Sequence, residues 1–124
     1  MIEAALKSLL VTNAGVSSRV YPVRLPQNAI FPAVTYQRVG GNRISSLSGP
    51  SGLAHPRFQT DVWAETYAES KTIAASIRTA LDGYSGTVDT LRIGGSILVS
   101  EWERYEPDAA LYRVSMDFNI FHDE

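Results

Sequence analysis

Apolar residues recur at helical spacing near the start of the chain. One stripe is formed by Ile2, Ala5, Leu6, Leu9 and Leu10. A row of apolar residues three and four positions apart is typical of one buried helix face. Asn13-Ala14-Gly15 then supplies a stop signal. The spacing predicts a short amphipathic helix at this end.

A second helical stripe lies in the middle of the chain and has clearer ends. It consists of Tyr67, Ser70, Ala74, Ile77 and Leu81. Thr66 and Glu69 are spaced as a capping box, in which the threonine hydroxyl accepts from the backbone N–H three residues later. Gly83 can adopt the left-handed conformation that closes a helix. A helix between these signals is predicted.

Four other stretches have the alternation or the β-branched and aromatic content of strands. They are Ala33–Val39, Arg57–Ala64, Leu91–Glu103 and Tyr112–Phe121. The predicted inward-facing residues are Val34, Tyr36, Phe58, Thr60, Val62, Ala64, Tyr112, Val114, Met116, Phe118 and Ile120. Gly94-Gly95 marks a bulge or bend. The last two strands are too close in sequence for a crossover, so they must be antiparallel.

The order of these elements predicts an α+β fold. It is a mainly antiparallel four-stranded sheet with two helices packed on one face. Residues 16–31 are predicted as loop and short extended pieces, because Pro22 and Pro26 each remove a backbone donor. The sequence has no internal repeat, and residues 1–124 are expected to form a single domain.

The stretch from Gly40 to Pro56 is predicted as a long loop between the first two strands. Its glycines and serines favour flexibility, and structureless loops longer than about 12–15 residues are uncommon in compact domains. It nevertheless carries the apolar residues Ile44, Leu47 and Leu53. The loop could be a tolerated surface insertion. The interpretation favoured here is an arm that becomes ordered against a neighbouring molecule.

Two aromatic residues fall on the polar faces of their strands. By alternation, Trp63 and Phe121 point away from the predicted core. Two aromatic side chains on one sheet face indicate a surface that another molecule covers. An edge strand wrapped by a loop of the same chain would explain them equally well.

Composition narrows the class of protein. The 124 residues are 44% hydrophobic and 19% charged, as in globular domains. There is no cysteine, so neither a disulfide nor a thiolate zinc site can form. No apolar run is long enough for a membrane-spanning helix. The first residues lack the basic start and apolar stretch of a signal peptide, so a soluble protein made in a cytosol is expected.

Charge is unevenly distributed along the chain, although the net charge is only −2. Residues 1–60 carry six cations and one acid, a net charge of +5, whereas residues 61–124 carry five cations and twelve acids, a net charge of −7. Interleaving of the two halves would mix these charges, which is the favoured interpretation. Alternatively, one basic and one acidic flank would suit a head-to-tail ring of identical subunits.

The residues of known catalytic motifs are missing. The chain has no phosphate-binding loop, dinucleotide fingerprint or nucleophile elbow. Its two histidines, His55 and His122, are far apart in sequence and make a weak case for a metal site. The acidic cluster Glu101, Glu103, Glu106 and Asp108 lies beside a predicted turn, where solvation favours a charged surface over acid–base chemistry. No catalytic residue, cofactor or metal is expected.

Several segments together resemble the tail terminator or tail-completion proteins of long-tailed phages. They are the opening helix, residues 31–37, residues 58–64 leading into the helix to Leu81, Leu81-Asp82-Gly83, Tyr105-Glu106-Pro107 and residues 111–118. The resemblance covers nearly the whole chain. Similar proteins occur in prophages and gene-transfer particles, so the resemblance implies a structural protein of a virion tail at the head–tail junction, assembled in the bacterial cytoplasm.

The resemblance also implies a ring, usually of six copies, at the head-proximal end of the tail tube. The implied partners are further copies of the chain, the tube protein and the head–tail connector or stopper protein. DNA would only pass through the lumen, and no membrane is involved. The residues expected at subunit or ring contacts are Arg24, Arg38, Arg43, Ile44, Leu47, Leu53, Trp63, Glu101, Glu103, Glu106 and Phe121. Among these, Arg24 and Arg38 are expected to meet some of the three glutamates.

Three other functions are compatible with the sequence. A head-closure or stopper protein would act at the same junction but bind DNA-filled heads instead of tails. A small ligand-binding or enzymatic α+β domain would be a monomer with a deep polar pocket. A subunit of the tube itself would polymerise without limit.

Overall fold

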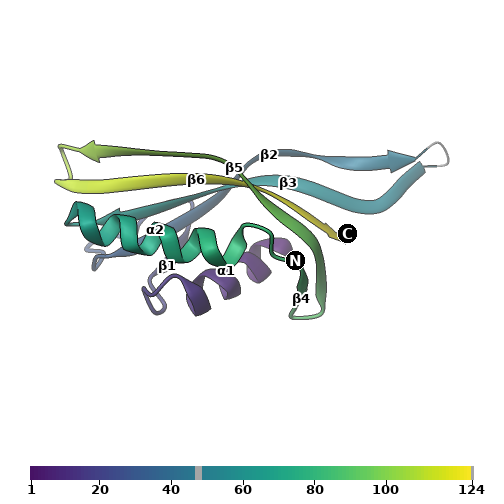
Figure 1. Cartoon of the computed structure of the whole chain (residues 1–124), viewed down its shortest axis with the longest axis horizontal. Helices are drawn as coiled ribbons and strands as arrows, with labels where there is room; N and C mark the ends of the chain where they lie inside the picture. Colours follow the sequence, from purple (N-terminus) through teal and green to yellow (C-terminus); the bar gives the residue numbers. More distant parts are fainter. Residues whose placement is uncertain (47–48, 124) are drawn as a thin grey trace.

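Two helices cover one face of a long, curled, six-stranded sheet in the computed structural model (Figure 1). The structure describes the backbone of residues 1–46 and 49–123, and the side chains of residues 1–40 and 55–123. The elements are α1 (Ile2–Asn13), β1 (Val20–Pro22), β2 (Ala33–Ser46), β3 (Gly49–Ala64), α2 (Tyr67–Leu81), β4 (Gly86–Val88), β5 (Leu91–Glu106) and β6 (Leu111–Asp123).

The strand order is β1-β2-β3-β6-β5-β4. All neighbouring strands are antiparallel except β1 and β2, which are parallel. The prediction of an α+β fold is confirmed, but the prediction of a four-stranded sheet is wrong. The two additional strands, β1 and β4, have three residues each and lie at the sheet edges. Strands this short contain too few residues for an alternation pattern, so the sequence does not reveal them.

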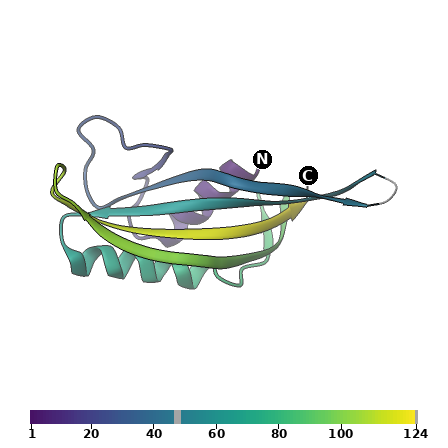
Figure 2. The same cartoon turned by 90° about the horizontal axis from the view of Figure 1, so that it is seen from above.

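The predicted long loop between residues 40 and 56 is also wrong. There β2 and β3 continue as a paired hairpin, with Gly41 opposite Pro56 and Ile44 opposite Leu53. Figures 1 and 2 show this hairpin arm, residues 41–46 and 49–56, extending past both helices. Glycine, serine and proline are local turn signals, but the antiparallel ladder between the two consecutive strands of the hairpin outweighs them.

The side chains of the predicted contact residues in the arm fall outside the described part of the structure. Leu47 lies in the stretch 47–48, which the structure does not describe. The strands place the backbone of Arg43, Ile44 and Leu53 but their side chains are not described. Their contacts with a neighbour therefore stay predictions.

The core lies between the helices and the inner face of the sheet. As the alternation predicts, Val34, Tyr36 and the even-numbered residues Phe58 to Ala64 are buried. On β6, Val114, Met116, Phe118 and Ile120 are buried as well. Tyr67 is the exception in the helical stripe of α2, because its side chain is exposed.

Local signals at the element ends are confirmed. The Thr66 hydroxyl accepts from the Glu69 N–H at 3.2 Å and caps α2. Gly83 follows α2 with φ +83°, which a residue with a Cβ rarely adopts. The ladder between β5 and β6 shifts register between Ile93 and Gly95, at the predicted bulge.

Candidate assembly interface

No helix or strand of the described residues covers the sheet face opposite the helices (Figures 1 and 2). On such a face, polar side chains would ordinarily be solvated. Nevertheless Thr35, Asp61, Ser115 and Asp117 are buried there. Larger side chains of the same face bond to them and lie over them. The outer face therefore has an ordered polar layer of its own.

Asp61 is the central acceptor of this layer and is only 4% exposed. The Ser115 hydroxyl donates to Oδ1, and Gln59 donates to the same oxygen at 3.1 Å. Arg113 Nε also donates to Oδ1, at 3.2 Å. A buried carboxylate needs such donors to offset its lost hydration. The bonds join neighbouring strands β3 and β6, because Asp61 and Ser115 are register partners.

Arg113 links this acceptor to two tryptophans. Its guanidinium donates to Asp61 and, at 3.2 Å, to Glu106. The guanidinium carbon lies 4.8 Å from the ring centre of Trp63 and 5.6 Å from that of Trp102. A guanidinium over an aromatic face is attracted by the ring quadrupole. These five residues are called the arginine–tryptophan cluster. Arginine and tryptophan are residue types enriched in protein interfaces.

Trp63 and Phe121, the two aromatic residues predicted on this face, are half-buried. Trp63 Nε1 donates to the Thr35 hydroxyl at 3.1 Å. Phe121 stacks on His55, with ring centres 5.3 Å apart. Each ring is thus partly covered by its own chain and partly available to another molecule. Their role in a subunit contact stays a prediction.

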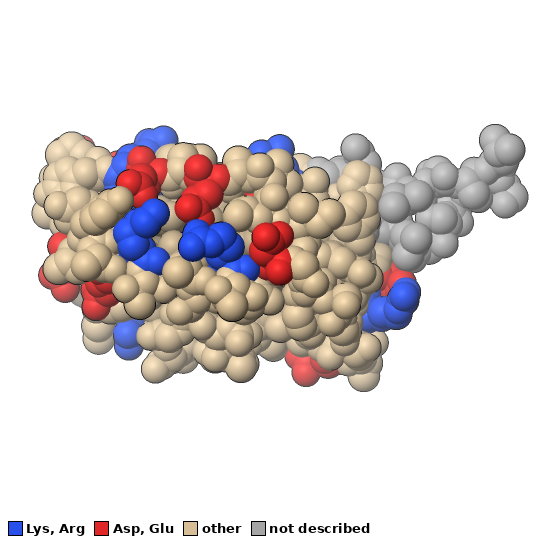
Figure 3. Space-filling view, viewed as in Figure 1, with Lys and Arg blue, Asp and Glu red and all other residues tan. Residues whose placement is uncertain are grey.

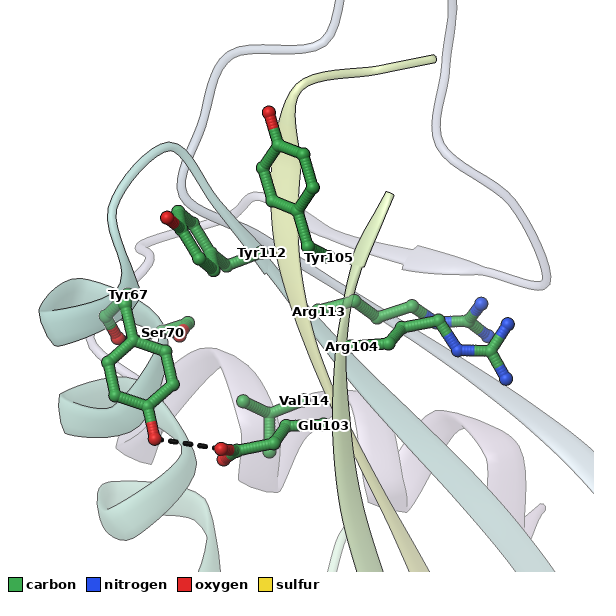
Figure 4. A pocket seen from close by; sticks show the side chains of 8 residues that line it. All are labelled: Tyr67, Ser70, Glu103, Arg104, Tyr105, Tyr112, Arg113 and Val114. Carbon is green, nitrogen blue, oxygen red and sulfur yellow. Dashed lines mark hydrogen bonds between the residues drawn. The ribbon is translucent and has the colours of Figure 1, made fainter. Parts of the chain in front are cut away.

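A second patch lies where the N-terminal end of α2 meets β5 and β6. Tyr67, Tyr105 and Tyr112 form a chain of edge-to-face contacts with ring centres 5.8 and 5.0 Å apart. They line a hollow of about 220 Å³ (Figure 4). In this view Arg104 and Arg113 point away from Tyr67 and Glu103. The hollow and the arginine–tryptophan cluster therefore lie on opposite sides of the strands.

The three predicted acidic contact residues already have partners within the chain. Arg78 donates to Glu101 at 2.7 Å, and Lys71 donates to Glu103 at 3.0 Å. Glu106 pairs with Arg113, as described above. Figure 3 shows acidic and basic side chains intermingled on the side where α2 lies. This mixing agrees with the favoured interpretation of the charge distribution.

The predicted basic contact residues lie at the opposite edge of the sheet, near β1 and β2. Arg38 is exposed on β2, 3.8 Å from Glu3 and 5.7 Å from the ring centre of Phe58. Arg24 is exposed just after β1. The structure of one copy does not bring either arginine to the three glutamates, so the expected contact would have to form between copies.

Glu103 has a perturbed pKa because of two donors from α2. The Tyr67 hydroxyl donates to Oε1 at 2.7 Å, and Lys71 donates to Oε2. The Tyr67 hydrogen bond, followed by that of Lys71, lowers the pKa of Glu103 from its ordinary value of 4.5. The same contacts raise the pKa of Tyr67 and of Lys71. A carboxylate with a lowered folded pKa adds stability above its unfolded pKa and loses it as the pH falls through the folded value.

Replacing Tyr67 with phenylalanine should raise the pKa of Glu103 toward 4.5, because the first of its two donors is removed. The stability that Glu103 adds above pH 4.5 should shrink, with no change at a pH below the folded value. NMR titration of the side-chain carboxyl carbon measures the pKa directly. Tyr105→Phe is the matched control and should leave Glu103 unchanged. An unaltered pKa in Tyr67→Phe would contradict this assignment.

The described residues show no cluster suited to a metal ion. No group of three or more histidine, cysteine, aspartate or glutamate side chains is arranged to hold one in the part of the chain that the structure covers. Within the same part, no helix is long and apolar enough to span a bilayer. Three buried polar atoms, Ser96 Oγ, Asp117 Oδ1 and His122 Nε2, have no hydrogen-bond partner there.

Sequence reasoning missed that Arg113 and Trp102 meet in the arginine–tryptophan cluster. Alternation did place Arg113 on the polar face of its strand, together with Ser115 and Asp117. The missing information is the register, which brings Trp63 opposite Arg113 and Trp102 opposite Ser115. A search for an arginine between two tryptophans on adjacent predicted strands would have found the cluster.

Comparison with known proteins gives a matching family and a solved structure with a similar fold. Residues 2–123 match the family described as "Tail completion protein gp17". No curated protein matches. Among solved structures, a chain from "Virion of native gene transfer agent (GTA) particle" is similar with a TM-score of 0.78 and 20% identity, over 99% of this chain and 95% of that one. At this identity the similarity shows a shared fold.

The family match covers nearly the whole chain and therefore establishes membership. It confirms the resemblance noted in the sequence, and the family is one of structural virion proteins rather than enzymes. The chain belongs to the tail completion protein gp17 family and is a structural component of a phage-type tail.

Proposed function

We propose that the protein forms a closed ring of six copies at the head-proximal end of the tail. There it ends polymerisation of the tube and presents the docking surface for the head–tail connector. The observation that carries this proposal is the family match over residues 2–123. The similarity in fold to a chain of a gene transfer agent virion supports a role in an assembled particle.

A ring explains termination without any catalytic step. When identical subunits join through two unlike surfaces, the assembly is finite only if the rotation between copies closes. One face of the closed ring would match the last ring of tube protein. The other face would lack a tube-like surface, so no further tube subunit could add. DNA would pass through the lumen, and a net charge of −2 gives the subunit no general attraction to it.

The hairpin arm is the element best suited to reach another molecule. It extends past the helices and includes Arg43, Ile44 and Leu53, and Leu47 stands between its two strands in the sequence. A two-stranded hairpin alone is marginally stable in water. Packing of the arm on a neighbouring subunit or ring would bury its apolar residues and hold it in place. The arginine–tryptophan cluster and Phe121 offer a second surface for the same assembly.

Growth of the tube in vitro tests the proposed function. Tube protein from the same particle is polymerised with and without the purified protein, and tube lengths are measured by electron microscopy. We expect tubes to stop growing at the end that carries this protein. Unchanged lengths, or incorporation along the whole tube, would contradict the proposal. Binding to DNA-filled heads in place of tails would indicate a stopper protein instead.

A further inference from the structure

The sheet has two open edges. β1 covers β2 only at Val34–Tyr36, and β4 covers β5 only at Leu91–Ile93. Next to β4, Gly83 donates to the Ser96 carbonyl, and the Asp82 carboxylate accepts from the Leu98 N–H. Within the described residues, no strand pairs with β5 from Val99 to Glu106, or with the outer side of β2 from Gln37 onward.

Exposed apolar side chains gather along these edges. Among the described residues, nine large apolar side chains are exposed. Four of the nine, Ile97, Val99, Trp102 and Tyr105, belong to β5. Their exposed fractions range from 37% for Trp102 to 53% for Ile97. Soluble proteins usually protect long edges with charge, proline or a covering element. In the open part of β5, the exposed apolar residues Val99, Trp102 and Tyr105 stand beside the charged residues Glu101, Glu103, Arg104 and Glu106, so a partner at this edge would meet both apolar surface and charge.

The β2 edge is also apolar. Val39 is exposed on this strand. Beside it, Met1, Val23 and Phe58 help to line a hollow of about 510 Å³. Met1 and Val23 belong to the same set of exposed large apolar side chains. Both open edges thus combine unpaired backbone groups with apolar surface.

The two edges also differ in charge. Residues 19–46, which include β1 and β2, contain four arginines and no acid. Residues 94–110, which include the open part of β5, contain four acids and one arginine. Within one copy, Lys71, Arg78, Arg104 and Arg113 lie against the glutamates of this stretch and offset most of their charge, so the β2 edge is the more basic of the two. Opposite potentials favour contact between unlike edges and oppose contact between like ones.

We propose that the open edge of β5 in one copy pairs with the open edge of β2 in the next copy. This inference rests on the proposed ring. The contact joins two unlike surfaces, as a closed ring of identical subunits requires. β2 pairs with β3, β3 with β6 and β6 with β5, and all three pairs are antiparallel. β2 and β5 therefore run in opposite directions. Copies with the same orientation around an axis therefore meet as an antiparallel pair. The registers place Glu101–Glu103 level with Val34–Tyr36, so the strands must tilt to the ring axis for the two open parts to meet and the sheets to become continuous.

Disulfide trapping tests this pairing, because the native chain contains no cysteine. Val39→Cys protein is mixed in turn with Ile97→Cys, Val99→Cys or Trp102→Cys protein under ring-forming conditions and then oxidised. A disulfide requires Cα atoms about 4.4–6.8 Å apart. We expect at least one mixture to give a covalent heterodimer. Ile30→Cys, exposed on the loop before β2, is the control and should give none with any β5 variant.

The possible outcomes separate the pairing from the ring. Rings without a disulfide in any mixture would overturn the pairing and leave the proposed function standing. A covalent dimer of Val99→Cys alone would show contact between like edges and would also overturn the pairing. If neither the protein alone nor the protein on purified tails forms rings, the proposed function fails and the pairing fails with it.

A charge on the edge gives an independent measurement. Val99→Lys should reduce ring formation at least tenfold, because the lysine would meet the basic residues that accompany β2. Its thermal unfolding should match that of the native protein, since Val99 is exposed. Ile30→Lys adds the same charge on the loop before β2, outside the open parts of both edges, and should assemble normally. Normal assembly of Val99→Lys would contradict the inference.

Discussion

Replacing Asp61 with alanine is expected to lower the free energy of unfolding by about 3 kcal/mol. The reason is that Asp61 is buried and accepts hydrogen bonds from Gln59, Arg113 and Ser115. Removing one partner of a buried ion pair leaves the other desolvated, which costs about 3–5 kcal/mol. Arg113 keeps Glu106 as a partner, so the lower end of that range applies.

Urea denaturation measures this loss of stability. Two further variants show whether the loss comes from the pair of Asp61 and Arg113. Glu106→Ala should cost less than about 1 kcal/mol, because this pair is more exposed. In a background of Arg113→Met, the additional loss from Asp61→Ala should be smaller, since no guanidinium is then left unpaired. A loss below about 1 kcal/mol for Asp61→Ala would show that the polar layer adds little to the outer face.

Placing aspartate at Leu47 and Leu53 together is expected to weaken subunit association at least about 100-fold. Full burial of each leucine contributes about 1.5–3 kcal/mol, and 1.4 kcal/mol corresponds to a factor of ten in an equilibrium constant. Stability of the monomer should change little, because Leu53 belongs to the hairpin arm and Leu47 follows the first strand of that arm in the sequence, and the core of the described residues is built without them. Sedimentation velocity measures the association, and counting joined particles measures head–tail joining.

Ser45→Asp with Ser51→Asp is the matched control for this prediction. It adds the same charge to the arm and removes no apolar side chain. We expect the control to retain most ring formation. If the leucine variant assembles and joins heads to tails as the native protein does, the arm is a tolerated insertion, which is the alternative that the sequence left open.

Prediction succeeded where the signal was local. The apolar stripes of α1 and α2, the Thr66 cap and the Gly83 stop involve residues within a few positions of one another. The alternation in β6 likewise identified its buried face. These features depend on backbone periodicity and capping, which a single sequence displays directly.

Prediction failed where distant segments decide the structure. β1 and β4 are strands only because longer strands lie beside them. The hairpin arm is a different failure, because its two strands are adjacent in sequence and pair in spite of their glycines and serines. The arginine–tryptophan cluster depends on the register of β3, β5 and β6. Alternation assigns a residue to a face, but it does not say which residues meet across that face.

The predicted contact residues also show that local patterns were predicted and contacts between separate elements were not. The sequence placed Trp63 and Phe121 on the outer face of the sheet. It did not show that α2 supplies Lys71 and Arg78 as partners for Glu103 and Glu101. That arrangement depends on how α2 packs beside β5, which neither segment displays by itself. Three of the four acids in the acidic cluster, Glu101, Glu103 and Glu106, are therefore paired with cations of the same chain.

The most direct test of the central claim is a count of subunits on the tail. Purified tails lacking this protein are incubated with it, and the complex is examined by electron microscopy and mass measurement. The proposal predicts a single closed ring of six copies at one end of each tail, which then binds heads. One copy per tail, protein along the whole tube, or no binding to tails would contradict it.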